Sequence, residues 1–125
     1  MKTFHEEILY TCQDPLTDQL FDEHSIFFDI ETTGFSPATS SLYMIGCASR
    51  KDSQICMDQF FAEKPEEEAE ILTAFFQLLS QYTTIITFNG VGFDIPYPTI
   101  TIFRSIFRIL IILIFSSPSL PLNFC

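Results

Sequence analysis

The sequence is short of basic residues, because its 125 residues include only six Lys and Arg against sixteen Asp and Glu. Phosphate groups are bound mainly by Lys and Arg, so this balance excludes nucleic-acid binding by simple electrostatic attraction. All sixteen acidic residues lie within residues 1–98, where only four basic residues accompany them and the net charge is −12. A nucleic-acid function would therefore need a cation to reverse the local field.

Several other features are absent. The four cysteines form no CxxC pair and no metal-ligand cluster, and the sequence does not start with an apolar stretch like a signal peptide. We therefore expect unpaired thiols and a cytoplasmic protein. The longest uninterrupted apolar run, residues 109–115, is far shorter than the roughly 20 residues that span a bilayer, so no stable membrane span is expected. The length excludes a multi-domain protein, and 47% hydrophobic residues exclude a disordered chain.

Four segments have the composition of β-strands. They are rich in β-branched and aromatic residues and end at turn-forming residues, and they cover Ser25–Ile30, Leu42–Ala48, Gln54–Phe61 and Thr83–Phe88. A short polar link between the second and third segments predicts a hairpin. We interpret residues 1–24, which show no clear period and are interrupted by Pro15, as an irregular or short helical lead-in.

One helix is predicted between the third and fourth strands. Pro65 and the acidic residues that follow it are favourable at a helix start, and apolar residues then recur at three- and four-residue spacing up to Tyr82. The order β-β-β-α-β predicts an antiparallel hairpin and a crossover helix, which returns the chain to pair in parallel with the first strand. The fold class is thus α/β with a mixed sheet.

Three carboxylates, Asp29, Glu31 and Asp94, stand in apolar runs, where an unpaired ionised group is costly to bury. Asp29 and Glu31 are two residues apart on a strand, so both side chains lie on the same face. Asp94 follows the strand expected beside the first, so it could join the pair. Asp94 taken alone is better explained as a structural turn cap, and it becomes a candidate ligand only when it is taken together with Asp29 and Glu31. Oxygen ligands without His or Cys favour Mg²⁺ or Mn²⁺ over zinc.

Two motifs carry a family resemblance. Phe28-Asp-Ile-Glu-Thr-Thr-Gly34 resembles the first motif of the DEDD family of 3′–5′ exonucleases, which have a ribonuclease H-like fold, and Phe88-Asn-Gly-Val-Gly-Phe-Asp-Ile-Pro-Tyr97 resembles the second. The residue pattern of the second motif is similar to that of YprB-type ribonuclease H-like proteins. The two motifs in this order are more specific than either one alone.

The resemblance implies phosphodiester hydrolysis at single-stranded 3′ ends of nucleic acid by a two-metal mechanism. Asp29 and Asp94 would bind the metals, and Glu31 would share the coordination and position the attacking water. The resemblance places Thr32, Thr33, Gly34, Asn89 and Phe93 beside the terminal nucleotide.

The third motif of that family, His-x-x-x-Asp or Tyr-x-x-x-Asp, has no counterpart, because no Asp, Glu or His follows Asp94. We therefore interpret residues 25–98 as a partial ribonuclease H-like exonuclease domain with little or no activity. Residues 99–125 form an apolar low-complexity tail, which we interpret as out-of-frame or aberrant sequence. The alternative is a non-catalytic cation-binding or membrane-associated interaction module.

Overall fold

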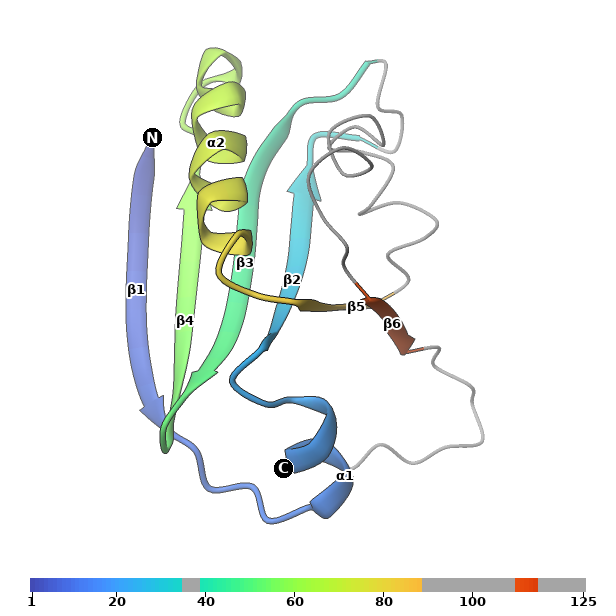
Figure 1. Cartoon of the computed structure of the whole chain (residues 1–125). Coiled ribbons are helices and arrows are strands. Elements are labelled where there is room, and N and C mark those ends of the chain that lie inside the picture. Colours follow the sequence, from blue (N-terminus) through green and yellow to red (C-terminus); the bar gives the residue numbers. More distant parts are fainter. Residues whose placement is uncertain (35–38, 89–109, 115–125) are drawn as a thin grey trace.

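A six-stranded mixed β-sheet is the framework of the protein (Figure 1). The computed structural model describes residues 1–34, 39–88 and 110–114. The strands lie in the order β1-β4-β3-β2-β5-β6. Their bounds are β1 Lys2–Leu9, β2 Ser25–Thr32, β3 Leu42–Lys51, β4 Gln54–Phe61, β5 Thr84–Phe88 and β6 Leu110–Ile114.

The predicted β-β-β-α-β order is confirmed by β2, β3, β4, the helical segment and β5. β2 pairs antiparallel with β3, and β3 with β4, whereas β5 pairs in parallel with β2. The crossover consists of a 3₁₀ turn, η1 (Pro65–Glu67), and the helix α2 (Glu68–Leu79). The α/β fold class and the ribonuclease H-like partial fold are therefore confirmed.

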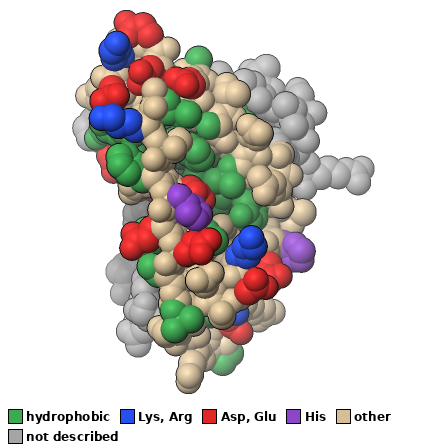
Figure 2. Space-filling view, turned by 90° about the vertical axis from the view of Figure 1, so that its left-hand side faces the viewer, with side chains coloured by type: hydrophobic (Ala, Val, Ile, Leu, Met, Phe, Trp, Pro, Cys, Tyr) green, Lys and Arg blue, Asp and Glu red, His purple; other side chains and the backbone are tan. Residues whose placement is uncertain are grey.

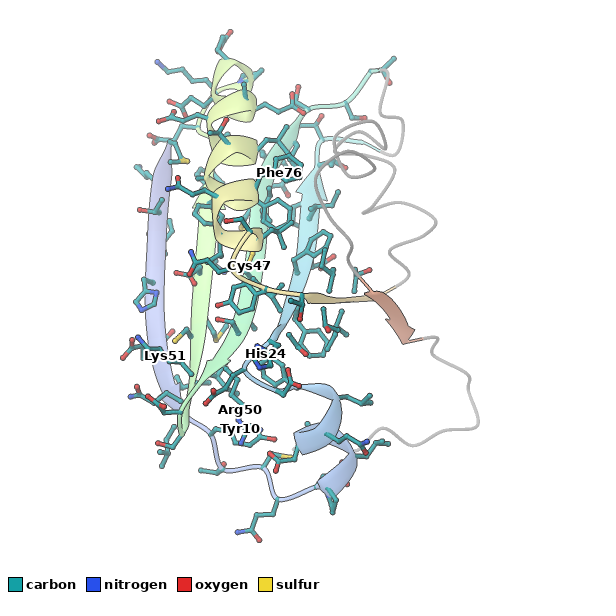
Figure 3. The ribbon with its side chains drawn as sticks, viewed as in Figure 1. Tyr10, His24, Cys47, Arg50, Lys51 and Phe76 are labelled. Carbon is teal, nitrogen blue, oxygen red and sulfur yellow. The ribbon has the colours of Figure 1, made fainter. Side chains whose placement is uncertain are left out.

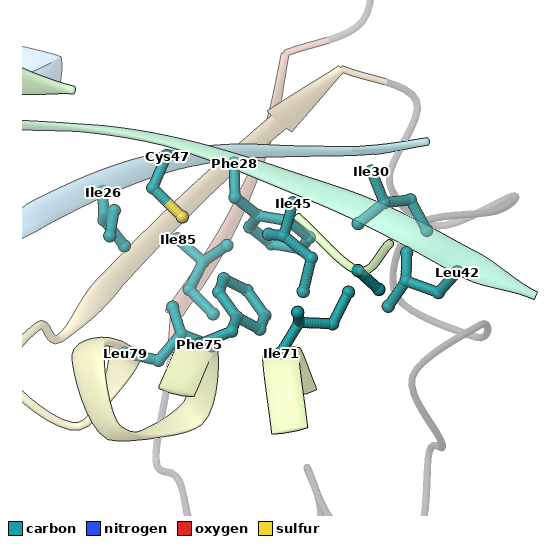
Figure 4. Packing of buried hydrophobic residues seen from close by; sticks show 11 residues of the cluster. Ile26, Phe28, Ile30, Leu42, Ile45, Cys47, Ile71, Phe75, Leu79 and Ile85 are labelled. Carbon is teal, nitrogen blue, oxygen red and sulfur yellow. The ribbon is translucent and has the colours of Figure 1, made fainter. Parts of the chain in front are cut away.

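Helix α2 packs on one face of the sheet through a stripe of buried residues at four-residue spacing, Ile71, Phe75 and Leu79 (Figure 4). Opposite them on β2 are Phe28 and Ile30, which are also buried. The Phe28 and Phe75 rings have centroids 4.9 Å apart. This cluster fixes β2 against α2 and determines which residues of β2 face away from the helix.

The first residues are where the sequence-based prediction was wrong. An irregular or short helical lead-in was expected, but residues 2–9 form β1, which pairs antiparallel with β4 along its whole length. Every residue of β1 is exposed, so the strand has no buried alternation by which to recognise it. Charged side chains on this edge strand oppose pairing with another chain. Figure 2, viewed from the side of β1, shows mainly Asp and Glu among the charged side chains.

The helical part of the lead-in is α1 (Pro15–Leu20). Asp14 caps it by accepting a hydrogen bond of 2.7 Å from the backbone N–H of Thr17, and Pro15 occupies the start of the helix, where its missing N–H costs nothing. Phe21, directly after α1, packs edge-to-face on Phe27 of β2 with ring centroids 5.1 Å apart. Because Phe27 alternates with the buried Phe28, α1 lies on the face of the sheet opposite α2.

Arg50 joins α1 to the sheet (Figure 3). Its guanidinium forms an ion pair with Asp18 of α1, donates a hydrogen bond of 3.3 Å to the carbonyl of Phe21, and lies 4.2 Å from the centre of the Tyr10 ring. One side chain of β3 thus holds together the chain on both sides of α1.

The described part of the tail forms β6, residues 110–114, parallel to β5. The sequence analysis assigned no strand there. The interpretation of residues 99–125 as out-of-frame or aberrant stays a prediction, as do the domain boundaries.

The cysteines differ in part from expectation. Cys47 and Cys56 are free and buried, as expected for thiols. Cys12 is disulfide-bonded, so the expectation of unpaired cysteines was wrong for this residue.

Candidate nuclease site on the open face of the sheet

Asp29 and Glu31 lie on the face of the sheet opposite α2. On β2 they alternate with Phe28 and Ile30, which are buried under the helix, whereas both carboxylates are exposed. The prediction that Asp29 and Glu31 share one face is confirmed. We call this face the open face and define it by six residues: Asp29 and Glu31 of β2, Gly46 of β3, Met57 and Gln59 of β4, and Phe4 of β1.

The expected burial of these two carboxylates was wrong. Asp29 and Glu31 have apolar neighbours in the sequence because every second residue of β2 enters the core. The two acids themselves lie on the other face of the strand. Within the part of the chain that the structure describes, neither carboxylate makes a hydrogen bond or an ion pair. Their oxygens are therefore available to solvent or to a hard cation, which prefers such ligands.

A bulge adjoins this pair. The pairing of β2 with β3 shifts between Glu31 and Thr32, because Glu31 is opposite Met44 and Thr32 is opposite Leu42. A bulge of this kind increases the local twist and redirects neighbouring side chains, and bulges are common beside active sites. One step along β2 corresponds to two along β3, so the extra residue is in β3, and Glu31 lies beside the bulge near the end of β2.

The segment after β2 is held by its own polar groups. The Thr32 hydroxyl donates a hydrogen bond of 2.6 Å to the carbonyl of Gly34, and the Thr33 hydroxyl accepts one of 2.9 Å from the backbone N–H of Ser41. A Cβ atom at Gly34 would lie 2.7 Å from the Ser40 Oγ, so a larger residue there would require the Ser40 hydroxyl to move. These contacts give Thr32, Thr33 and Gly34 a structural role, and their role beside a nucleotide stays a prediction.

Because β2 and β5 pair in parallel, their carboxyl ends lie at the same end of the sheet, as predicted. Phe27 is opposite Ile86, and two residues further along the two strands are Asp29 and Phe88. Asn89, Phe93 and Asp94 lie outside the described residues. Among residues 1–34, 39–88 and 110–114, no three His, Cys, Asp or Glu side chains are grouped so that they could hold a metal ion. The three-carboxylate cluster therefore stays a prediction.

Sequence reasoning missed Gly46. It is directly opposite Asp29 in the pairing of β2 with β3. The signal was present in the sequence, because a glycine inside a strand often marks a close approach of a ligand or another backbone.

Comparison with protein families matches residues 26–101, more than half of the chain, to the RNase_H superfamily. The chain belongs to the RNase_H superfamily. The matched segment includes β2, β3, β4, α2 and β5, so the superfamily match covers the elements that position Asp29 and Glu31.

Two relatives of this RNase_H superfamily chain were found among curated sequences. It is 31% identical over 71 residues to the uncharacterized protein YprB of Bacillus subtilis (strain 168), a match that covers 56% of this chain and 17% of YprB. It is 41% identical over 46 residues to DNA polymerase 1 of Sulfurisphaera ohwakuensis, covering 37% of this chain and 5% of the polymerase. The matched segment is thus a small part of each relative.

Helices of sufficient length and apolarity to cross a membrane are absent from the described residues of this RNase_H superfamily chain.

Proposed function

We propose that this chain is a metal-dependent 3′–5′ exonuclease domain of the DEDD type, acting on single-stranded ends of nucleic acid. Membership of the RNase_H superfamily supports a nuclease-like function. The proposal depends on one observation. Asp29 and Glu31 are exposed on the same face of β2, near the end of the sheet at which the parallel strand β5 also ends.

In this proposal Mg²⁺ or Mn²⁺ is the cofactor. When bound, such cations lower the pKa of a coordinated water and neutralise charge on the phosphate oxygens. Asp29 and Asp94 would hold the cations, and Glu31 would share the coordination and help to position the attacking water. The terminal nucleotide lies beside Thr32, Thr33, Gly34, Asn89 and Phe93.

The charge of the chain makes this cofactor essential for binding as well as for chemistry. Residues 1–98 carry a net charge of −12, and the exposed carboxylates on the open face add to the repulsion of phosphate. Nucleic acid should therefore bind only when divalent cations are present.

We further propose that these 125 residues alone have little or no turnover. No Asp, Glu or His follows Asp94, so the chain supplies neither the fourth carboxylate nor the His or Tyr of the third motif. Cation binding by the existing carboxylates does not require that motif, so binding and hydrolysis are separable in this chain. The cytoplasmic location stays a prediction.

The test uses Asp29→Asn with Asp52→Asn as a matched control. Both substitutions remove one negative charge, and Asp52 lies in the β3–β4 turn with a φ of 55°, which asparagine adopts readily. We expect Mn²⁺ binding, measured by calorimetry, to weaken strongly in Asp29→Asn and to persist in Asp52→Asn. Labelled single-stranded DNA and RNA should bind in the presence of Mn²⁺ and be degraded slowly or not at all.

Three results would count against parts of this proposal. Robust degradation that Asp29→Asn abolishes would contradict the proposed inactivity and keep the exonuclease assignment. Absence of both cation and nucleic-acid binding would contradict the assignment itself. Cation binding without nucleic-acid binding would favour the alternative, a non-catalytic cation-binding module, and flotation with lipid vesicles would test whether that module is membrane-associated.

A further inference from the structure

Gly46 lies in the middle of β3, directly opposite Asp29. Residues opposite each other in an antiparallel pair place their side chains on the same face, with Cβ atoms about 5 Å apart. Any side chain at position 46 would therefore stand beside the Asp29 carboxylate. The absence of one leaves a gap in the open face at this point.

Neither of the usual structural reasons for a glycine applies to Gly46. None of the glycines in the described residues has a positive φ, so the backbone conformation at position 46 does not require glycine. A Cβ atom added at Gly46 would meet nothing within 4 Å, whereas one at Gly34 would lie 2.7 Å from the Ser40 Oγ. A glycine inside a strand lowers the stability of the fold, so its presence at position 46 needs an explanation other than folding. Room for a ligand is such an explanation.

The row of residues that crosses the sheet from Asp29 continues through Gly46 to Gln59 of β4 and Phe4 of β1. Phe4 is 56% exposed, which is unusual for a large aromatic side chain. A groove of about 370 Å³ on the outer part of the sheet is lined by Phe4, His5, Glu6, Met57 and Gln59. Adjacent strands are about 4.8 Å apart, so the row from Asp29 to Phe4 is about 14 Å long.

We propose that single-stranded nucleic acid crosses the open face along this row, with its 3′ end at Asp29. The nucleotide next to the terminal one lies over Gly46, and a further base stacks on the Phe4 ring within hydrogen-bonding reach of the Gln59 amide. This inference rests on the exonuclease function proposed above and names the residues that select a single strand.

The chemistry of the row favours bases over phosphates. The basic side chains of the neighbouring strand positions are paired with acids, Lys2 with Glu63 at 2.7 Å, His5 with Asp58 at 2.7 Å and Arg50 with Asp18. An exposed aromatic ring can stack on a base and an amide can hydrogen-bond to it, while the divalent cations at Asp29 would offset the charge of the phosphates. Stacking on an aromatic ring tolerates any base, so we expect little sequence preference.

The experiment measures two quantities in the full chain, the unfolding midpoint in urea and the Kd for fluorescein-labelled single-stranded DNA with Mn²⁺ by anisotropy. Gly46→Val should leave the midpoint unchanged or raise it, because valine favours strands and the space is open. It should raise Kd roughly tenfold or more, because the added methyl groups obstruct the nucleotide. Phe4→Ala should raise Kd by about fivefold or more.

Thr3→Ala is the matched control for Phe4→Ala, since Thr3 is an exposed neighbour on the opposite face of β1. Its Kd should equal that of the unmodified chain. A lower unfolding midpoint in Gly46→Val would show that the glycine is structural and overturn the inference. Unchanged Kd values in Gly46→Val and Phe4→Ala, with binding lost in Asp29→Asn, would overturn it and leave the exonuclease proposal standing. If the unmodified chain binds neither labelled single-stranded DNA nor labelled single-stranded RNA, both proposals are refuted.

Discussion

Replacing Phe75 by alanine should separate α2 from the strand that carries Asp29. Phe75 is fully buried in the middle of α2, and its ring packs on Phe28 with centroids 4.9 Å apart. Phe28 immediately precedes Asp29 on β2, so this contact fixes the position of the candidate site from the opposite face of the sheet. The substitution would leave a cavity between the helix and the sheet.

The expected cost is about 4 kcal/mol in the free energy of unfolding, which combines lost transfer free energy and the cavity. A domain of this size has a total stability of about 5–15 kcal/mol, so Phe75→Ala should be near the limit of folding. Phe75→Leu fills more of the space and should cost about 1.5 kcal/mol. Urea unfolding followed by circular dichroism measures both values, and Mn²⁺ calorimetry on folded Phe75→Leu tests whether the site is disturbed.

Gln77→Ala is the control, because Gln77 is an exposed residue of the same helix. It should change stability by less than about 0.5 kcal/mol. A loss below about 1 kcal/mol in Phe75→Ala, with an unchanged slope in urea, would refute the packing of α2 on β2 described above.

Three further predictions concern the rest of the sheet. Arg50→Lys should cost about 1–2 kcal/mol in urea unfolding, because lysine cannot both stack on Tyr10 and reproduce the guanidinium hydrogen bonds. Hydrogen bonds to Asp58 and then Glu7 raise the pKa of His5 above 6.5. The stability that these hydrogen bonds give the folded chain is therefore fully present below pH 6.5 and is lost as the pH rises through the raised pKa of His5. NMR titration should show a lower His5 pKa in Asp58→Asn. Burial raises the pKa of the Cys47 thiol to about 12, so at pH 8 it should resist alkylation until the chain unfolds, as mass spectrometry would show.

The parts of the fold that the sequence predicted are those whose residues alternate between a buried and an exposed environment. In β2 the apolar residues Phe28 and Ile30 enter the core, and in α2 the buried stripe has helical spacing. Those patterns identify both the element and the face that it presents. β1 has no such pattern, since it lies at the edge of the sheet with both faces exposed, and its pairing with β4 is a tertiary effect.

The environment of Asp29 and Glu31 was predicted wrongly, and the assignment of these residues to a functional site stays a prediction. The spacing of Asp29 and Glu31 placed them on one face, but an apolar run does not reveal which face of a strand is covered. Only the structure shows that α1 covers the start of β2, at Phe27, and leaves the later residues exposed. For the same reason the sequence could not show that Gly46 stands beside Asp29, because that depends on the register between strands.

Exposure of the two carboxylates changes what the proposed cation would do for the fold. Had Asp29 and Glu31 been buried, two unpaired charges in the core would have made a bound cation part of the folding free energy. On the open face each carboxylate keeps its hydration, and the mutual repulsion of the pair is weakened by water. The core around Phe75 lies on the other side of the sheet and does not depend on the pair. The proposed cation would therefore not be needed for folding, and removal of Mn²⁺ should leave the urea unfolding midpoint unchanged.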